Sequence, residues 1–126
     1  METKNGNSAE KNWGWIGEMG KQSQRKGAAG EQELVEILNG YGYETERGGS
    51  LTYGTVPDVT GLPGIHIECK RSERLNILEA INQAARDSLR FRDGLPAVFH
   101  RRNRQPWLVT MRLVDWMTLY RRGIGK

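Results

Sequence analysis

The sequence has little of what several functional classes require. Its 126 residues include one cysteine, Cys69, and two histidines, His66 and His100. A single cysteine excludes an intrachain disulfide and a multi-cysteine zinc site, and two histidines exclude a histidine-rich metal site. No apolar run approaches the ~20 residues of a transmembrane helix, and the polar first ten residues lack the apolar segment of a signal peptide. The length fits one domain, and we expect a cytoplasmic protein without membrane contact.

Charge is unevenly distributed along the chain. Residues 1–69 contain 6 basic and 10 acidic residues, a net charge of −4, whereas residues 70–126 contain 13 basic and 5 acidic residues, a net charge of +8. The basic half is a candidate surface for a polyanion such as nucleic acid. A well-solvated surface would explain the same bias, so the charge gains meaning only beside a site that acts on phosphate.

The pattern along the chain predicts a mixed sheet with helices packed on it. Residues 1–25 are polar and glycine-rich and are expected to form a flexible arm, and residues 26–126 are expected to form one domain. We expect helices over 28–39, 76–91 and 113–120, and strands over 43–47, 51–56, 65–70, 97–100 and 107–111. This order, α-β-β-β-α-β-β-α, predicts the α/β (α+β) class.

The second expected helix carries its own start signal and an apolar stripe. Asn76 followed three residues later by Glu79 is typical of a helix N-terminus. The residues that should face the sheet are Ile77, Leu78, Ile81, Ala84, Ala85 and Leu89.

Asp58, Glu68 and Lys70 form the constellation best suited to catalysis. Glu68 and Lys70 lie two apart on an expected strand and therefore share a face, while Ile65 and Ile67 take the opposite face. A glycine-rich turn would bring Asp58 close to Glu68. Two carboxylates suit Mg²⁺, and a nearby lysine can orient or deprotonate a water or stabilise charge on a phosphate. The alternative is a surface Glu–Lys pair with a turn aspartate, but the whole string favours a metal-dependent phosphodiesterase site.

Glu31 is the expected further acidic member of this site. It lies on the same helical face as Leu34, Val35 and Leu38. A carboxylate on an apolar stripe needs a partner such as a metal-bound water or a buried lysine. The alternative is a position in the first helical turn that the helix dipole favours.

Together these motifs resemble the PD-(D/E)xK nuclease superfamily and, within it, the archaeal-type Holliday-junction resolvases. The resemblance covers residues 25–110, approximately. The matching residues are Lys26-Gly27 with Glu31, Leu34, Leu38, Gly42-Tyr43, Arg47, Gly49-Ser50, Pro57-Asp58-Val59, Ile67-Glu68-Cys69-Lys70, 94–98 and 107–109. The sequence departs from the family at Gln32, where members commonly have arginine, and in its longer N-terminal tail.

The resemblance implies a restriction-endonuclease-like αβββαβ core, a Mg²⁺ cofactor that Mn²⁺ can replace, and a homodimer that cuts DNA at four-way junctions. It implies that Asp58 and Glu68 bind the metal with the Cys69 carbonyl and Glu31, and that Lys70 is the catalytic lysine. Residues expected to contact DNA are Lys26, Arg47, Ser50, Arg71, Arg74, Arg101, Arg102 and Arg104. Gln83 is similar to a helical glutamine of exonuclease-like and VRR-type relatives and is expected beside the site or on the surface.

Two other functions remain open at this point. One is a structure- or end-specific nuclease that does not prefer junctions, and the other is a non-catalytic DNA-binding module on a nuclease fold. The small size suggests a stand-alone enzyme, of phage or mobile-element origin. The apolar C-terminal residues either cap the sheet within one subunit or form a subunit interface. They are Trp107, Met111, Trp116, Met117 and Tyr120.

Overall fold

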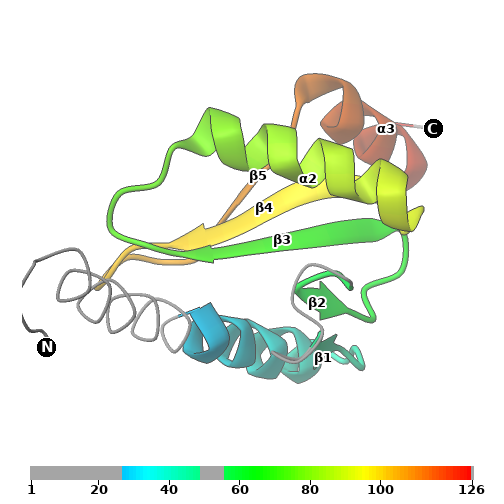
Figure 1. Cartoon of the computed structure of the whole chain (residues 1–126). Coiled ribbons are helices and arrows are strands. Elements are labelled where there is room, and N and C mark those ends of the chain that lie inside the picture. The colour runs from blue at the N-terminus through cyan, green and yellow to red at the C-terminus, as the bar shows by residue number, and fades with distance from the viewer. Residues whose placement is uncertain (1–26, 49–55, 126) are drawn as a thin grey trace, which may run out of the picture.

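The computed structural model describes residues 27–48 and 56–125 (Figure 1). The expected N-terminal arm lies outside these ranges, as does all of the expected strand over 51–56 except Val56. Within them the chain forms a five-stranded mixed sheet with helices on both faces. The expected fold class, a mixed sheet with helices packed on it, is therefore confirmed.

The strands lie in the sheet in the same order as in the sequence. They are β1 (Glu46–Arg47), β2 (Val59–Thr60), β3 (Ile65–Arg71), β4 (Leu95–Arg101) and β5 (Leu108–Thr110). β3 and β4 pair in parallel, and the other neighbouring strands pair antiparallel. A parallel pair needs a long crossover connection, which α2 (Ile77–Phe91) supplies.

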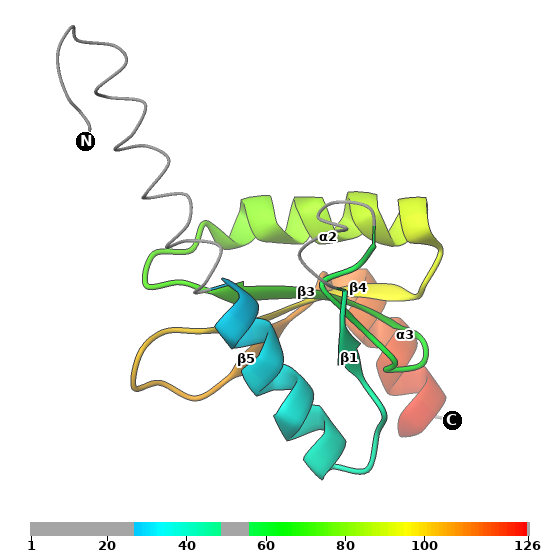
Figure 2. The same ribbon diagram turned by 60° about the horizontal axis from the view of Figure 1, so that its bottom comes forward.

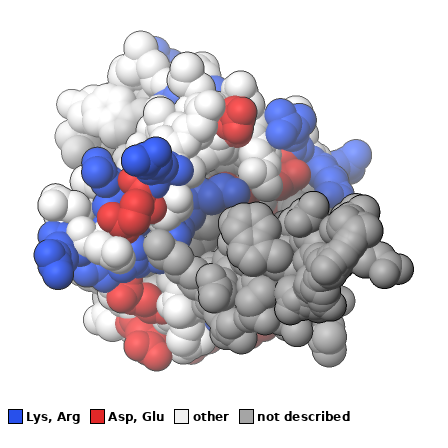
Figure 3. Space-filling view, turned by 60° about the vertical axis from the view of Figure 1, so that its left-hand side comes forward, with Lys and Arg blue, Asp and Glu red and all other residues white. Residues whose placement is uncertain are grey.

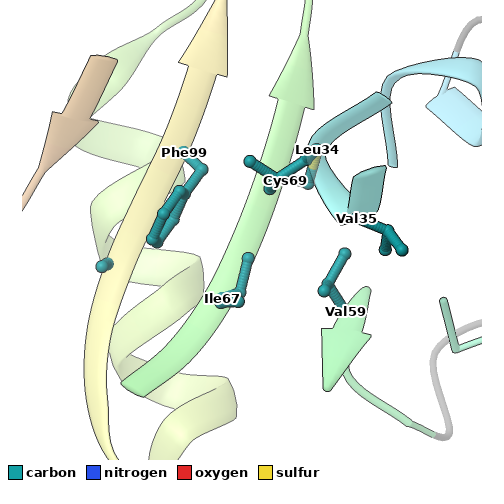
Figure 4. Close-up of a cluster of buried hydrophobic side chains, with 7 residues drawn as sticks. Leu34, Val35, Val59, Ile67, Cys69 and Phe99 are labelled. Atoms are coloured by element: carbon teal, nitrogen blue, oxygen red, sulfur yellow. The ribbon is translucent and has the colours of Figure 1, made fainter. Parts of the chain in front are cut away.

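The N-terminal helix, described over residues 27–40, covers one face of the sheet, and α2 covers the other (Figures 1 and 2). The first core joins Leu34 and Val35 of the N-terminal helix to Val59, Ile67 and Phe99 of the sheet (Figure 4). Alternate residues of a strand point to opposite faces. Ile67 therefore packs under the N-terminal helix, and its even-numbered neighbours on β3 face α2.

The start of α2 is as expected, but its buried stripe is narrower. The Asn76 side chain accepts a hydrogen bond from the Glu79 backbone N–H at 3.2 Å. Leu78 and Leu89, expected to face the sheet, are 73% and 79% exposed. A straight helix presents only a narrow arc to a sheet, and small residues let the two approach closely. The buried residues are Ala80, Ile81, Ala84 and Ser88.

β2, the strand before β3, begins at Val59, two residues after Pro57. β2 pairs with β3 through Val59, which lies opposite Ile67. Because Val59 is the first residue of β2, Asp58 directly precedes this strand. The strand expected over 43–47 is reduced to β1, because the Thr45 N–H and hydroxyl bond to the Asn39 side chain at 2.7 and 2.8 Å. These side-chain bonds replace the strand pairing that Thr45 would otherwise make.

The C-terminal segment divides between the core and the surface. Trp107 and Met111 pack against the first core. α3 (Leu113–Gly123) extends past its expected end at residue 120, and its Trp116 and Tyr120 are exposed and stack with ring centroids 5.2 Å apart. Among the helices described, none has the length and apolar character to cross a membrane.

Candidate active site

Glu68 lies at the centre of the acidic cluster. It is on the middle of β3, 3% exposed, and its Oε2 atom lies 3.3 Å from Lys70 Nζ. The two side chains point to the same face because they are two residues apart on a strand. A buried carboxylate needs a positive partner, and the predicted Glu68–Lys70 pair supplies one here.

Asp58 is fixed beside β3 by a backbone hydrogen bond. Its Oδ2 atom accepts a bond from the Cys69 N–H at 3.1 Å, because the β2–β3 pairing brings residue 58 alongside this part of β3. Burial and the nearby negative charge of Glu68 raise the pKa of Asp58 to about 7. The structure therefore brings together the two carboxylates that the sequence separates by ten residues.

Glu31 enters the cluster from the N-terminal helix. Its Oε1 atom is 3.3 Å from Arg47 Nε on β1, and both side chains are partly buried. Burial raises the pKa of Glu31, although the hydrogen bond from Arg47 opposes this shift. The charges of Glu68 and Lys70 also act on this carboxyl, so three acidic residues from separate elements share one electrostatic environment.

Lys70 is held from α2 as well as from its own strand. Its Nζ donates a hydrogen bond to Gln83 Oε1 at 3.3 Å. Of the two positions expected for Gln83, the one beside the site is the one observed. The ammonium group thus lies between a carboxylate and a neutral amide oxygen, which fixes its direction without cancelling its charge.

The donor set suits a hard divalent cation. Asp58, Glu68 and Glu31 offer carboxylate oxygens, which Mg²⁺ and Mn²⁺ prefer. Burial raises the pKa of the Cys69 thiol well above its usual range, so its sulfur stays protonated and is no ligand at neutral pH. Three partly buried carboxyl groups around Lys70 and Arg47 leave an excess of negative charge that a cation would balance.

A second set of titratable groups on the α2 side of Glu68 was not expected from the sequence. His66 is buried two residues before Glu68 on the same face of β3. His66 Nδ1 lies 2.8 Å from Asp93 Oδ2, and its Nε2 lies 3.9 Å from Glu68 Oε1. Burial lowers the His66 pKa, but the neighbouring carboxylates of Glu68 and Asp93 outweigh this effect and raise the pKa overall. Asp87 of α2 completes a cluster with His66 and Glu68. The sequence feature that could have predicted this cluster is the two-residue spacing of His66 and Glu68, which places both side chains on one face of a strand.

The residues expected to contact DNA fall into three groups. Lys26 and Ser50 lie outside the described residues, and Arg47 pairs with Glu31. Arg71 donates to the Asn103 side chain at 2.8 Å, and Arg101 forms an ion pair with Glu33 at 2.7 Å. These two arginines are therefore anchored within the molecule.

The remaining three, Arg74, Arg102 and Arg104, are exposed. Figure 3 shows Lys and Arg side chains in several groups on one face of the molecule, with Asp and Glu side chains between them. The basic side chains on this face are therefore interrupted by acidic ones and do not form a continuous stripe.

Comparison with solved structures identifies a protein with the same fold. Archaeoglobus fulgidus Hjc, a Holliday junction resolvase from an archaeal hyperthermophile, matches with a TM-score of 0.51. The alignment covers 68% of this chain and 72% of that one, at 20% sequence identity. The two chains share a fold. No protein-family model matches this sequence, and no curated protein matches it. The expected αβββαβ order of elements is confirmed, and so is the expected similarity in fold to a resolvase.

Proposed function

We propose that this chain is a metal-dependent endodeoxyribonuclease that hydrolyses phosphodiester bonds, with a Holliday junction as its preferred substrate. The convergence of Asp58, Glu68 and Lys70 carries the proposal. Asp58 directly precedes β2, whereas Glu68 and Lys70 lie on β3. Asp58 nevertheless bonds to the backbone beside Glu68, and Glu68 pairs with Lys70. The fold shared with a resolvase supports the same reading.

The cofactor proposed is Mg²⁺, which Mn²⁺ can replace. Asp58 and Glu68 would hold it, together with the Cys69 carbonyl and with Glu31 directly or through water. When bound, such an ion polarises a phosphate oxygen and lowers the pKa of a water. The backbone bond from Cys69 to Asp58 keeps that carboxylate in position, so little reorganisation is needed on binding.

Lys70 is the proposed catalytic lysine. Glu68 and Gln83 each lie 3.3 Å from its Nζ, and the charge of Lys70 acts on Glu31 and Asp58. The ammonium group can position the attacking water for in-line displacement and stabilise negative charge that develops on the phosphate.

Lys26, Arg47 and Ser50 are proposed to contact the phosphate backbone near the scissile bond. Exposed arginines add sequence-independent affinity that falls steeply with salt. They are Arg74, Arg102 and Arg104, with Arg71 and Arg101 contributing if DNA displaces their present partners. The proposed domain over residues 26–126 would carry all of these groups. The proposed process is DNA recombination and repair, and the proposed location is the cytoplasm.

A homodimer is proposed because two symmetric cuts across a junction require two sites related by a two-fold axis. β5 at the edge of the described sheet and the adjoining α3 leave apolar side chains exposed. They include Leu108, Val109, Leu113, Val114 and Trp116. Light scattering of the purified chain should give twice the mass of one chain, and a monomer at micromolar concentration would oppose the proposal.

Gln83 favours a second candidate, a structure- or end-specific nuclease. Gln83 is similar to a helical glutamine of exonuclease-like and VRR-type relatives, and it accepts a hydrogen bond from Lys70. Both candidates use the same Asp58, Glu68 and Lys70 chemistry, so only the choice of DNA substrate separates them.

The deciding experiment uses a labelled four-way junction with duplex, flap and single-stranded DNA as controls, each with Mg²⁺, Mn²⁺ or EDTA. Paired symmetric nicks on the junction alone, lost in EDTA, are the expected result. Cutting of another substrate in place of the junction would transfer the proposal to the second candidate. Binding without any cutting would replace both with a non-catalytic DNA-binding module.

A further inference from the structure

The Nε2 atom of His66 is buried without a hydrogen-bond partner in the described part of the chain, whereas buried polar groups are normally hydrogen-bonded. The ring is 1% exposed. Its Nε2 atom faces Glu68 Oε1 at 3.9 Å, which is too long for a hydrogen bond. An unpartnered polar atom in a core is destabilising, so a group that binds this nitrogen would be stabilising.

The other ring nitrogen defines what that group must be. His66 Nδ1 lies 2.9 and 2.8 Å from the two oxygens of Asp93, so Nδ1 donates its hydrogen to a carboxylate. In the neutral ring this leaves a lone pair on Nε2, directed at Glu68. A carboxylate that holds one nitrogen of a histidine while the other binds a metal is a recurrent arrangement in metal sites.

Asp87 supplies a third ligand from α2. Four residues of a helix rise ~6.0 Å, and two residues of a strand rise ~6.6 Å. Because α2 and β3 run in opposite directions, every fourth residue of α2 therefore lies beside every second residue of β3. Gln83 accordingly contacts Lys70, and two turns later Phe91 stacks on His66 with centroids 6.2 Å apart. Asp87, midway between them, places a carboxylate oxygen within 4.8 Å of both other ligand atoms.

We propose that His66, Glu68 and Asp87 form a second divalent cation site on the α2 side of Glu68. Protein ligands bind Zn²⁺ at ~2.0–2.2 Å, so two ligands of one ion lie up to ~4.3 Å apart. The 3.9 Å between Nε2 and Oε1 is within that limit. One imidazole and two carboxylates suit Mn²⁺ or Zn²⁺ better than Mg²⁺, which prefers oxygen alone.

The two sides of the Glu68 carboxylate separate this site from the proposed catalytic one. Oε2 faces Lys70, while Oε1 faces His66. Glu68 would therefore couple an ion held by Asp58 to an ion held by His66, as carboxylates do in two-metal sites. The inference does not depend on nuclease activity, because His66 and Asp87 have no part in the proposed reaction.

Binding of Mn²⁺ to tag-free protein tests the site. Asp58→Asn removes a ligand of the proposed catalytic site, and this variant should retain one ion. Pulsed EPR of that ion should detect coupling to an imidazole nitrogen. Adding Asp87→Asn should weaken binding at least ~10-fold, and adding His66→Gln should abolish the nitrogen coupling. Thermal unfolding in EDTA checks that each variant folds, and Asp87→Asn, at a partly exposed helix position, keeps the test decisive if His66→Gln does not.

Two matched controls complete the experiment. His100→Gln removes the other histidine, whose Nε2 lies 2.8 Å from the Thr110 hydroxyl, and Glu79→Gln removes a different acid of α2; neither should change binding. An ion bound without nitrogen coupling, or equal affinity with and without Asp87, would overturn the inference. Wild-type protein that cuts no DNA while Asp58→Asn still holds a nitrogen-bound ion would defeat only the proposed function.

Discussion

Lys70 of β3 and Gln83 of α2 are joined by a hydrogen bond of 3.3 Å from Nζ to Oε1, and the same Nζ lies 3.3 Å from Glu68. Gln83 thus acts on Lys70 without altering its charge. We expect Gln83→Ala to lower the cleavage rate ~10-fold, because a group that orients a functional residue typically contributes 10–100-fold. Single-turnover kinetics should register this as a slower chemical step with unchanged DNA affinity.

The neighbouring residue Asn82 offers a control for this variant. It lies on α2 with an exposed side chain, so Asn82→Ala makes an equivalent truncation away from the site and should cut at the wild-type rate. Equal rates for Gln83→Ala and Asn82→Ala would mean that the Lys70–Gln83 bond has no role in the reaction.

Asp58→Ala should abolish cleavage while leaving DNA binding in place. Asp58 is a proposed direct ligand of the metal. The loss of a direct ligand should reduce the rate by more than ~100-fold, beyond the effect of an indirect partner. Gel-based cleavage and binding assays measure the two effects separately. Glu36→Gln, an exposed acid of the N-terminal helix, is the charge-matched control and should be fully active. Normal cleavage by Asp58→Ala would remove this residue from the site.

The raised pKa of Asp58 predicts a pH dependence of the metal-free protein. Burial and the charge of Glu68 raise its pKa from 3.8 to about 7, so the folded chain binds a proton that the unfolded chain has already released between these values. This contribution to the free energy of unfolding is therefore present below pH ~4 and is lost as the pH rises toward 7. Urea unfolding in EDTA should give a steeper decline with pH for wild type than for Asp58→Asn.

Mg²⁺ supplies the companion measurement. A bound cation favours the charged carboxylate, so saturating Mg²⁺ should move the Asp58 titration, followed by carboxyl-carbon NMR, to lower pH. A midpoint that is the same in Mg²⁺ and in EDTA would show that the ion does not bind at Asp58.

The main elements of the fold were predictable because their signals are local. Asn76 and Glu79 begin α2 as expected, and alternation along β3 correctly buries Ile67. The errors came from tertiary context. Leu78 and Leu89 belong to the expected stripe, yet both are exposed. The residues of α2 that are buried are Ala80, Ile81, Ala84 and Ser88. The antiparallel pairing of β2 with β3 is local, and the expected turn anticipated it. The parallel pairing of β3 with β4 spans α2 and depends on long-range contacts that no window of sequence contains.

Within the candidate site, predictability followed the number of elements involved. Glu68 and Lys70 share one strand, so their spacing alone places them together. The Asp87 carboxylate joins His66 only because α2 runs antiparallel to β3 in matching steps, and this requires the packed structure. The roles assigned to Glu31, Asp58, Glu68 and Lys70 remain predictions that the experiments above test.

Gly94 should be the least replaceable glycine among the described residues near the sheet. Its φ is +130°, and an added Cβ would lie 2.3 Å from the Gly64 carbonyl carbon and oxygen. The same segment bonds Leu95 N–H to Gly64 O at 2.9 Å, and so aligns the starts of the parallel β3 and β4. Gly94→Ala combines backbone strain with displacement of this pair, and we expect it to lower the free energy of unfolding by about 2 kcal/mol or more.

Gly40 provides the opposite case in the same measurement. It is the last described residue of the N-terminal helix, and an added Cβ there meets nothing within 4 Å. Alanine favours a helix over glycine by about 0.8–1.0 kcal/mol in helix interiors, and part of this should be gained at the helix end. Urea denaturation should therefore give opposite signs for Gly40→Ala and Gly94→Ala. Unchanged stability in Gly94→Ala would mean that the close approach of residues 64 and 94 does not hold β3 and β4 in register.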